Sequence, residues 1–293
     1  KLEGTRNAEE YQQVSSFLDN QLLNTEENAR TRQSKLLRHF ILGTAEYLIG
    51  DYDNSYKNML QAGRILEGNK GLLANREDLY IRIMANQVLT NIRSGKHSDA
   101  EAHLVKFEKY NVSTKSLNPY RNYIGYLLRL ILLNTSLQYK KAVEMIRENE
   151  NWVAHHENKI TKQGVLPQEQ FYSIFQKATA LMGSGEYHQT KKIITTFLST
   201  YKNQLKEEAF FMIRIFYLII LLELGDEMLL NSELESLRRA LVKVKRKFQF
   251  ERTILAFVKG MEIKNTSSAV KLHYKRLAYE LDLLKTVPFE KNV

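Results

Sequence analysis

Residues 48–56 read Leu48-Ile49-Gly50-Asp51-Tyr52-Asp53-Asn54-Ser55-Tyr56, a break at glycine between two stretches in which apolar residues recur at helical spacing. Altered copies of this break return along the chain. Gly95, Gly185 and Gly225 hold the glycine position in three copies, and Leu137 holds it in a fourth. Successive positions are separated by 45, 42, 48 and 40 residues, and this nearly regular repeat length predicts a stack of helix hairpins.

The composition favours long helices. The 293 residues are 43% hydrophobic and 26% charged, as in ordinary globular proteins, and only 13 Gly and 3 Pro are available for turns. The longest uninterrupted apolar run covers residues 215–222, far fewer than the roughly 18 to 20 residues that cross a bilayer. We therefore expect no membrane span, and we expect this run to form a helix that is buried on all sides.

The residues around each break resemble the tetratricopeptide repeat. That family has a small residue closing the first helix, an aromatic residue two positions later, a small residue five later and a large apolar residue nine later. The aromatic position is occupied here by Tyr52, His97, Tyr139, Tyr187 and Glu227. The small position is occupied by Ser55, Ala100, Ala142, Thr190 and Leu230, and the apolar position by Met59, Leu104, Ile146, Ile194 and Leu234. Seven residues before the break, where the family prefers Gly or Ala, stand Gly43, Val88, Leu130, Ala178 and Leu218.

The pattern and the resemblance together predict an all-α fold, a right-handed superhelical solenoid of about six antiparallel helix hairpins. Residues 1–24 are expected to form a capping helix, residues 25–248 the repeats, and residues 249–293 a helical pair that caps the other end. The repeat length in this chain is longer than the 34 residues of the standard tetratricopeptide repeat. The block from residue 206 to 260 also resembles the carboxy-terminal part of certain bacterial proteins known only as tetratricopeptide-containing, which have no assigned activity.

The resemblance implies a non-catalytic scaffold that binds a peptide or a partner helix in the concave groove of the array. Projecting the family's register gives the residues expected to line that groove: Phe40, Thr44, Tyr47, Arg82, Leu89, Tyr172, Phe175 and Met182. One alternative is the peptide-sensing regulatory domain of a larger protein. The identity of the partner does not follow from the sequence.

A second alternative is nucleic-acid binding through a basic patch. Seven cations and a single acid, Glu251, lie between residues 236 and 252, a net charge of +6 where the whole chain carries +10. The cations of this patch are Arg238, Arg239, Lys243, Lys245, Arg246, Lys247 and Arg252. An apolar stripe on the same segment faces inward, so we favour a solvated outer face over a nucleic-acid site.

Recognisable catalytic constellations are missing. The sequence has no glycine-rich phosphate loop, no His-Glu-x-x-His and no Gly-x-Ser-x-Gly, so we expect no enzyme and no cofactor. Cys is absent, which excludes disulfides, thiolate metal sites and cysteine nucleophiles. Adjacent residues of a helix point about 100° apart, so His155 and His156 are expected to mark a solvated helix end and not a metal site. His97 and His103 are expected at the surface.

The chain begins at Lys1 without an initiator Met or a signal-peptide pattern. This suggests a segment or a processed product, and a cytoplasmic location is favoured.

Overall fold

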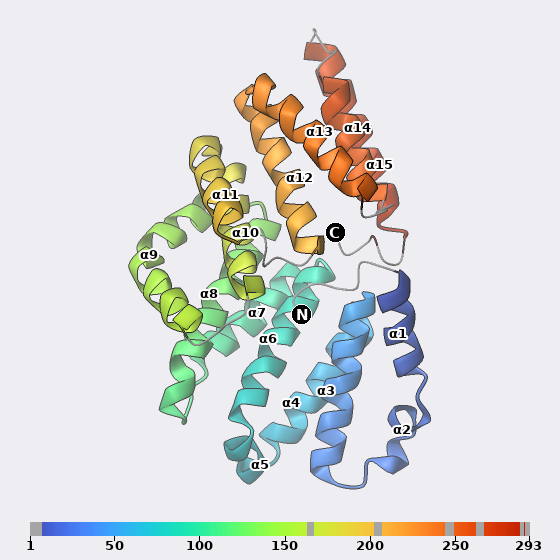
Figure 1. Ribbon diagram of the computed structural model, residues 1–293. Coiled ribbons are helices and arrows are strands. Elements are labelled where there is room, and N and C mark those ends of the chain that lie inside the picture. Colours follow the sequence, from blue (N-terminus) through green and yellow to red (C-terminus); the bar gives the residue numbers. More distant parts are fainter. Residues whose placement is uncertain are drawn as a thin grey trace. The chain divides into compact units, whose positions relative to one another are not determined.

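The computed structural model describes residues 8–162, 167–201, 207–243, 249–261, 267–287 and 290. Within these ranges the chain is helical, and it contains no strand (Figure 1). The all-α class predicted from the sequence is therefore confirmed. Within the same ranges, no helix has both the length and the apolar character that crossing a bilayer requires.

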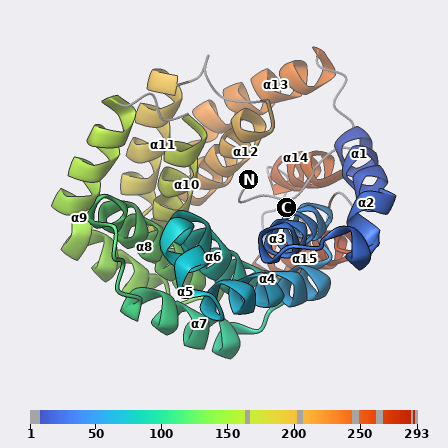
Figure 2. The same cartoon turned by 90° about the horizontal axis from the view of Figure 1, so that it is seen from below.

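The described residues fall into two compact units. The first unit extends to Gln138 and also takes in Asn149–His156 from the long helix α9 (Tyr139–Lys162). Its helices are α1 (Ala8–Leu18), α2 (Gln21–Asn24), α3 (Arg32–Ile49), α4 (Tyr52–Glu67), α5 (Lys70–Asn75), α6 (Glu77–Arg93), α7 (His97–Lys109) and α8 (Asn118–Thr135). Figure 2 shows α3, α4, α6 and α7 following one another side by side, each packed on the next.

The second unit contains Tyr139–Glu148 and the chain from Glu157 onward. Its remaining helices are α10 (Pro167–Gly183), α11 (Tyr187–Tyr201), α12 (Glu207–Leu224), α13 (Glu227–Lys243), α14 (Gln249–Met261) and α15 (Ser267–Leu284). Helix α12 has core side chains on more than one side, with Leu218 and Leu221 in one apolar cluster and Ile213 and Ile220 in another. The prediction that its long apolar run is buried on all sides therefore holds for most of the run, while Tyr217, Ile219 and Leu222 are partly buried.

The five predicted breaks share one backbone conformation. Gly50, Gly95, Leu137, Gly185 and Gly225 have φ of 77°, 71°, 57°, 86° and 66°, and no other described residue has a positive φ. At each of them the next residue donates its N–H to the carbonyl five positions back, the Schellman pattern that ends a helix at a left-handed residue. A new helix begins two residues after every break.

Leu137 is the one side chain in this left-handed set, and it is 71% exposed. We expect Leu137→Gly to stabilise the protein by about 0.5–1 kcal/mol, because removing the Cβ relieves more strain than glycine's extra freedom in the unfolded chain takes back. Chemical denaturation measures the change. Leu137→Ala, which removes the exposed side chain but keeps the Cβ, is the control; equal stabilisation by both variants would show that the backbone conformation is not the cause.

The repeat positions predicted to be small lie where paired helices approach each other. Ser55, Ala100, Ala142 and Thr190 are fully buried, and Leu230 is 4% exposed. In the pair of α3 and α4, the hydroxyl of Ser55 donates to the carbonyl oxygen of Gly43 at 2.6 Å. A Cβ on Gly43 would lie 3.1 Å from Met59 Cε and from the Ser55 carbonyl, so the absence of a side chain there permits this spacing.

Two buried carboxylates tie together segments that are far apart in the sequence. Glu77, at the start of α6, accepts the backbone N–H groups of Ser113 and Thr114 at 2.7 and 2.8 Å. Glu290 accepts the N–H groups of Gln249 and Phe250, both at 2.8 Å, and so satisfies the first amides of α14. The side chains of Glu77 and Glu290 are 4% and 6% exposed, which protects these hydrogen bonds from water.

Candidate functional site

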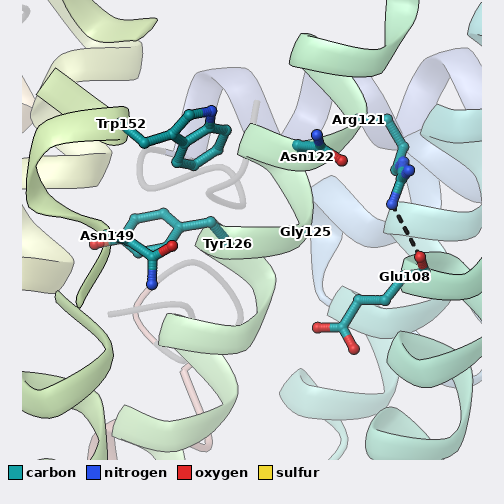
Figure 3. Close-up of a pocket in the computed structure, with 7 residues that line it drawn as sticks. All are labelled: Glu108, Arg121, Asn122, Gly125, Tyr126, Asn149 and Trp152. Carbon is teal, nitrogen blue, oxygen red and sulfur yellow. Dashed lines mark hydrogen bonds between the residues drawn. The ribbon is translucent and has the colours of Figure 1, made fainter. Parts of the chain in front are cut away.

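A polar cavity of about 270 Å³ lies in the first unit between α7, α8 and the part of α9 that belongs to this unit. We call it the Trp152 pocket. Helix α7 contributes Glu108, α8 contributes Arg121, Asn122, Gly125 and Tyr126, and α9 contributes Asn149 and Trp152 (Figure 3). A Cβ on Gly125 would lie 3.4 Å from the ring of Phe107, so the glycine lets α8 pack closely on α7 beside the pocket.

The aromatic side of the pocket is a cluster of rings from α8 and α9. Trp152 is the only tryptophan of the chain and is 37% exposed. Its ring meets Tyr126 edge-on at 6.3 Å between centroids, and it stacks on His156 at 5.9 Å. Tyr123 lies against the other part of this cluster, 4.7 Å from the His156 ring. These contacts hold Trp152 in place while leaving about a third of it open to a ligand.

The expectation that the histidine pair marks a solvated helix end is wrong for His156. His156 is 8% exposed and stacked between rings, whereas His155 is exposed. The reason is that α9 continues to Lys162, so residues 155 and 156 lie inside the helix, and their different directions send one inward and the other to solvent. His97 and His103 are only partly exposed: His97 Nδ1 lies 3.4 Å from Ser136 Oγ, and His103 Nε2 lies 3.2 Å from Tyr56 Oη.

The charged side of the pocket is formed by Arg121. Its Nη1 donates to the main-chain oxygen of Glu108 at 2.9 Å, the contact drawn in Figure 3. Its Nε is buried and has no hydrogen-bond partner among the described residues. A buried donor without a partner is costly, by about 1–3 kcal/mol, and an acceptor from a ligand that reached this nitrogen would remove that cost.

The carboxylate of Glu108 is already engaged elsewhere. Arg129 donates to it through Nε at 3.1 Å and through Nη2 at 2.7 Å, and its Nη1 reaches Glu101 at 2.5 Å. Desolvation opposes the charge of Arg129, but the hydrogen bonds with Glu108 and Glu101 outweigh it and raise the pKa of the guanidinium above its ordinary value. The carboxylate of Glu108 thus pairs with Arg129, and Arg121 contacts the main-chain carbonyl oxygen of Glu108 instead.

The residues predicted to line a groove are distributed differently in the first unit. Phe40 and Thr44 lie together in a second, apolar pocket of about 320 Å³ between α1 and α3. Tyr47 and Leu89 are 6% and 4% exposed and belong to the hydrophobic core, and Arg82 is exposed.

In the second unit the structure brings Tyr172, Phe175 and Met182 together. All three are partly buried and pack on the apolar cluster shared by α10, α11 and α12. The Phe175 ring lies 5.2 Å from that of Phe216, and the Tyr172 ring meets Phe171 edge-on at 5.9 Å. Side chains that are predicted to line a groove therefore also contribute to packing between helices.

The basic patch is described in part, since Lys245, Arg246 and Lys247 lie outside the described residues. Arg239, Lys243 and Arg252 are exposed, as a solvated outer face requires. The guanidinium of Arg238 pairs with Glu235 at 3.0 Å, which offsets part of the local positive charge.

The residues of the Trp152 pocket were missed by reasoning from the sequence. The one signal available was that the chain's single Trp lies in a polar stretch, one helical turn before His156. In the described ranges no cluster of three or more His, Asp or Glu side chains is placed to hold a metal ion. The pocket therefore offers a ring face and a guanidinium donor, a combination suited to binding.

Comparison with known proteins adds no identification: no family model, curated protein or solved structure matches the chain.

Proposed function

We propose that the chain is a tetratricopeptide-like helical solenoid that acts as a non-catalytic scaffold and binds a segment of another polypeptide. The five turns with one backbone conformation support a repeated hairpin. In an array of this kind each hairpin contacts mainly its neighbours, which leaves an extended surface for a partner. The Trp152 pocket supplies an anchoring point on that surface.

The observation that carries the proposal is the buried Nε of Arg121, which has no hydrogen-bond partner in the described residues and lies in the same pocket as Trp152, which is 37% exposed. A guanidinium binds carboxylates well, because its N–H groups match their geometry. The Trp152 and Tyr126 rings suit an apolar or aromatic side chain. The ligand class that satisfies both is a peptide with an aromatic residue close to a carboxylate.

A polypeptide fits the rest of the pocket as well. Asn122 is exposed at the pocket, and its amide offers both a donor and an acceptor, the pair that a peptide backbone requires. Nucleic acid fits less well, because phosphate binding depends on several cations and Arg121 is the one cation among the residues that line this pocket. A peptide-sensing regulatory domain would use the same pocket and would differ in what it controls.

The test is an array of eight-residue peptides in which one Phe and one Asp are placed at every relative spacing, probed with the whole chain. Peptides that bind are then titrated while the fluorescence of Trp152, the chain's only tryptophan, is followed. We expect Arg121→Gln to weaken binding of the Phe-Asp peptides about tenfold or more, since a charge-assisted hydrogen bond is lost. Peptides with Asn in place of Asp should bind both proteins almost equally.

Two controls separate the pocket from the other surfaces. Arg82→Gln removes the exposed arginine expected in the groove, and Arg239→Gln removes an exposed cation of the basic patch. Neither should change the affinity for the Phe-Asp peptides. If Arg82→Gln weakened binding and Arg121→Gln did not, the site would be the groove projected from the sequence. If no peptide of the array bound, the proposed ligand class would be wrong.

A further inference from the structure

Helix α15 is apolar on two opposite faces. Its inner face places Leu277 and Leu281 against the cluster formed by α12, α13 and α14, and Leu284 on the same helix is 6% exposed. On its other face Leu272, Tyr279 and Leu283 are 69%, 66% and 50% exposed. Isolated exposed apolar side chains are ordinary, but three on one stripe of a single helix indicate a contact surface.

The exposed stripe has the spacing of a helix-pairing seam. Leu272, Arg276, Tyr279 and Leu283 are separated by four, three and four residues, the alternation that keeps one line of a helix facing a partner helix. Arg276 interrupts the apolar seam, and it is exposed while its Nε donates to Glu280 on the same helix at 2.8 Å. If a second helix crosses in the opposite direction about a centre between Leu277 and Ala278, Leu272 meets Leu283 of the other helix and Arg276 meets Tyr279.

The charges beside the seam are complementary under the same operation. Lys275 flanks the amino-terminal half of the stripe, and Asp282 flanks its carboxy-terminal half on the same side. Both are exposed, and Asp282 is 2.7 Å from Lys285 in a pair that is open to water. In an antiparallel pair of identical helices, Lys275 of each lies opposite Asp282 of the other. A parallel pair would not bring Lys275 and Asp282 of the two copies together.

We propose that the exposed stripe of α15 is a self-association surface, on which a second copy of this chain docks antiparallel through a twofold axis. In this dimer Leu272 of each copy packs on Leu283 of the other. Arg276 of each copy lies over the Tyr279 ring of the other, a cation–π contact. The Lys275–Asp282 pairs on the flank set the direction. A single helix pair is small for a stable interface, so the dimer forms and dissociates readily with concentration.

Charge reversal in two separate chains tests this surface. Lys275→Glu leaves only acids on the flank, and Asp282→Lys leaves only bases, so each variant by itself repels its own copy. When the two variants are mixed, both flank contacts become complementary again. We expect sedimentation equilibrium to show the unaltered chain dimerising, each single variant associating at least tenfold more weakly, and the equimolar mixture forming a heterodimer.

The mixing result cannot arise from contacts within one chain, because residues 275 and 282 are seven apart on the helix and are altered in different molecules. Leu272→Glu, placed at an exposed position, should abolish association and leave the circular dichroism spectrum and thermal transition unchanged. An unaltered chain that stays monomeric to several hundred micromolar would overturn the proposal. A mixture of the variants that associates no better than either alone would also overturn it, even if the unaltered chain dimerises.

Discussion

Glu77→Gln is expected to lower the free energy of unfolding by about 2–4 kcal/mol. The carboxylate accepts three hydrogen bonds, from the backbone of Ser113 and Thr114 and from the hydroxyl of Tyr110, and it is 4% exposed. The amide nitrogen of Gln is a donor and would face a backbone donor. Asp78→Asn is the matched control, because Asp78 lies next in the same first turn but is exposed; it should change stability by less than about 1 kcal/mol.

The same carboxylate makes stability depend on pH in a definite direction. Burial tends to raise the pKa of Glu77, but the hydrogen bonds from Ser113, Thr114 and Tyr110 outweigh it, so the pKa lies below its ordinary value of 4.5. The contribution of Glu77 is therefore fully present above pH 4.5 and is lost as the pH falls through the folded pKa. Urea denaturation at pH 7 and at successively lower pH should show the difference between the unaltered chain and Glu77→Gln shrinking. A difference that stays constant with pH would mean that Glu77 acts by packing alone.

Gly183→Ala is expected to destabilise the chain by about 2–3 kcal/mol, since an added methyl group overpacks a closed contact. Its Cβ would fall on the ring of Tyr139 at Cγ, the ring atom bonded to Cβ, so relieving the clash requires the whole ring to move and not only its outer end. Thermal unfolding followed by circular dichroism measures the loss.

Gly185→Ala, two residues further on, separates this clash from the general effect of replacing glycine. A Cβ at Gly185 meets no atom within 4 Å, and only its φ of 86° opposes the substitution, so the loss should be about 1 kcal/mol. Combining Gly183→Ala with Tyr139→Ala should recover most of the Gly183 effect. If the two substitutions simply add, the ring of Tyr139 is not the cause.

The turns could be predicted because their signal is local. Glycine is favoured where the backbone becomes left-handed, as it does at Gly50, Gly95, Gly185 and Gly225. The regular repeat length placed Leu137 in the same set, although leucine is not typical of such a turn. The buried small positions followed from the same register. These features depend on residues that are close together in the sequence, so they can be predicted from the sequence alone.

The candidate site could not be found in this way. Periodicity marks a side chain as apolar and inward, but a groove and a core are both apolar, which is why Tyr47 and Leu89 were expected to line a surface and lie in the core. The Trp152 pocket depends on relations between three helices: α7, α8 and α9 all line it, and Glu108 of α7 pairs with Arg129 of α8 while the Nε of Arg121 has no partner among the described residues. No single helix displays these relations.

The hydrogen bonds between Glu290 and the start of α14 bear on the order in which the second unit folds. Most contacts between helices join helices that lie close together in the sequence. Such contacts form early, because the chain between them is short. The Glu290 carboxylate reaches back about 40 residues to the first amides of α14, across the whole of α15. Because those amides gain their partner only after α15 has docked, we expect the start of α14 to become rigid late in folding although it precedes α15 in the chain.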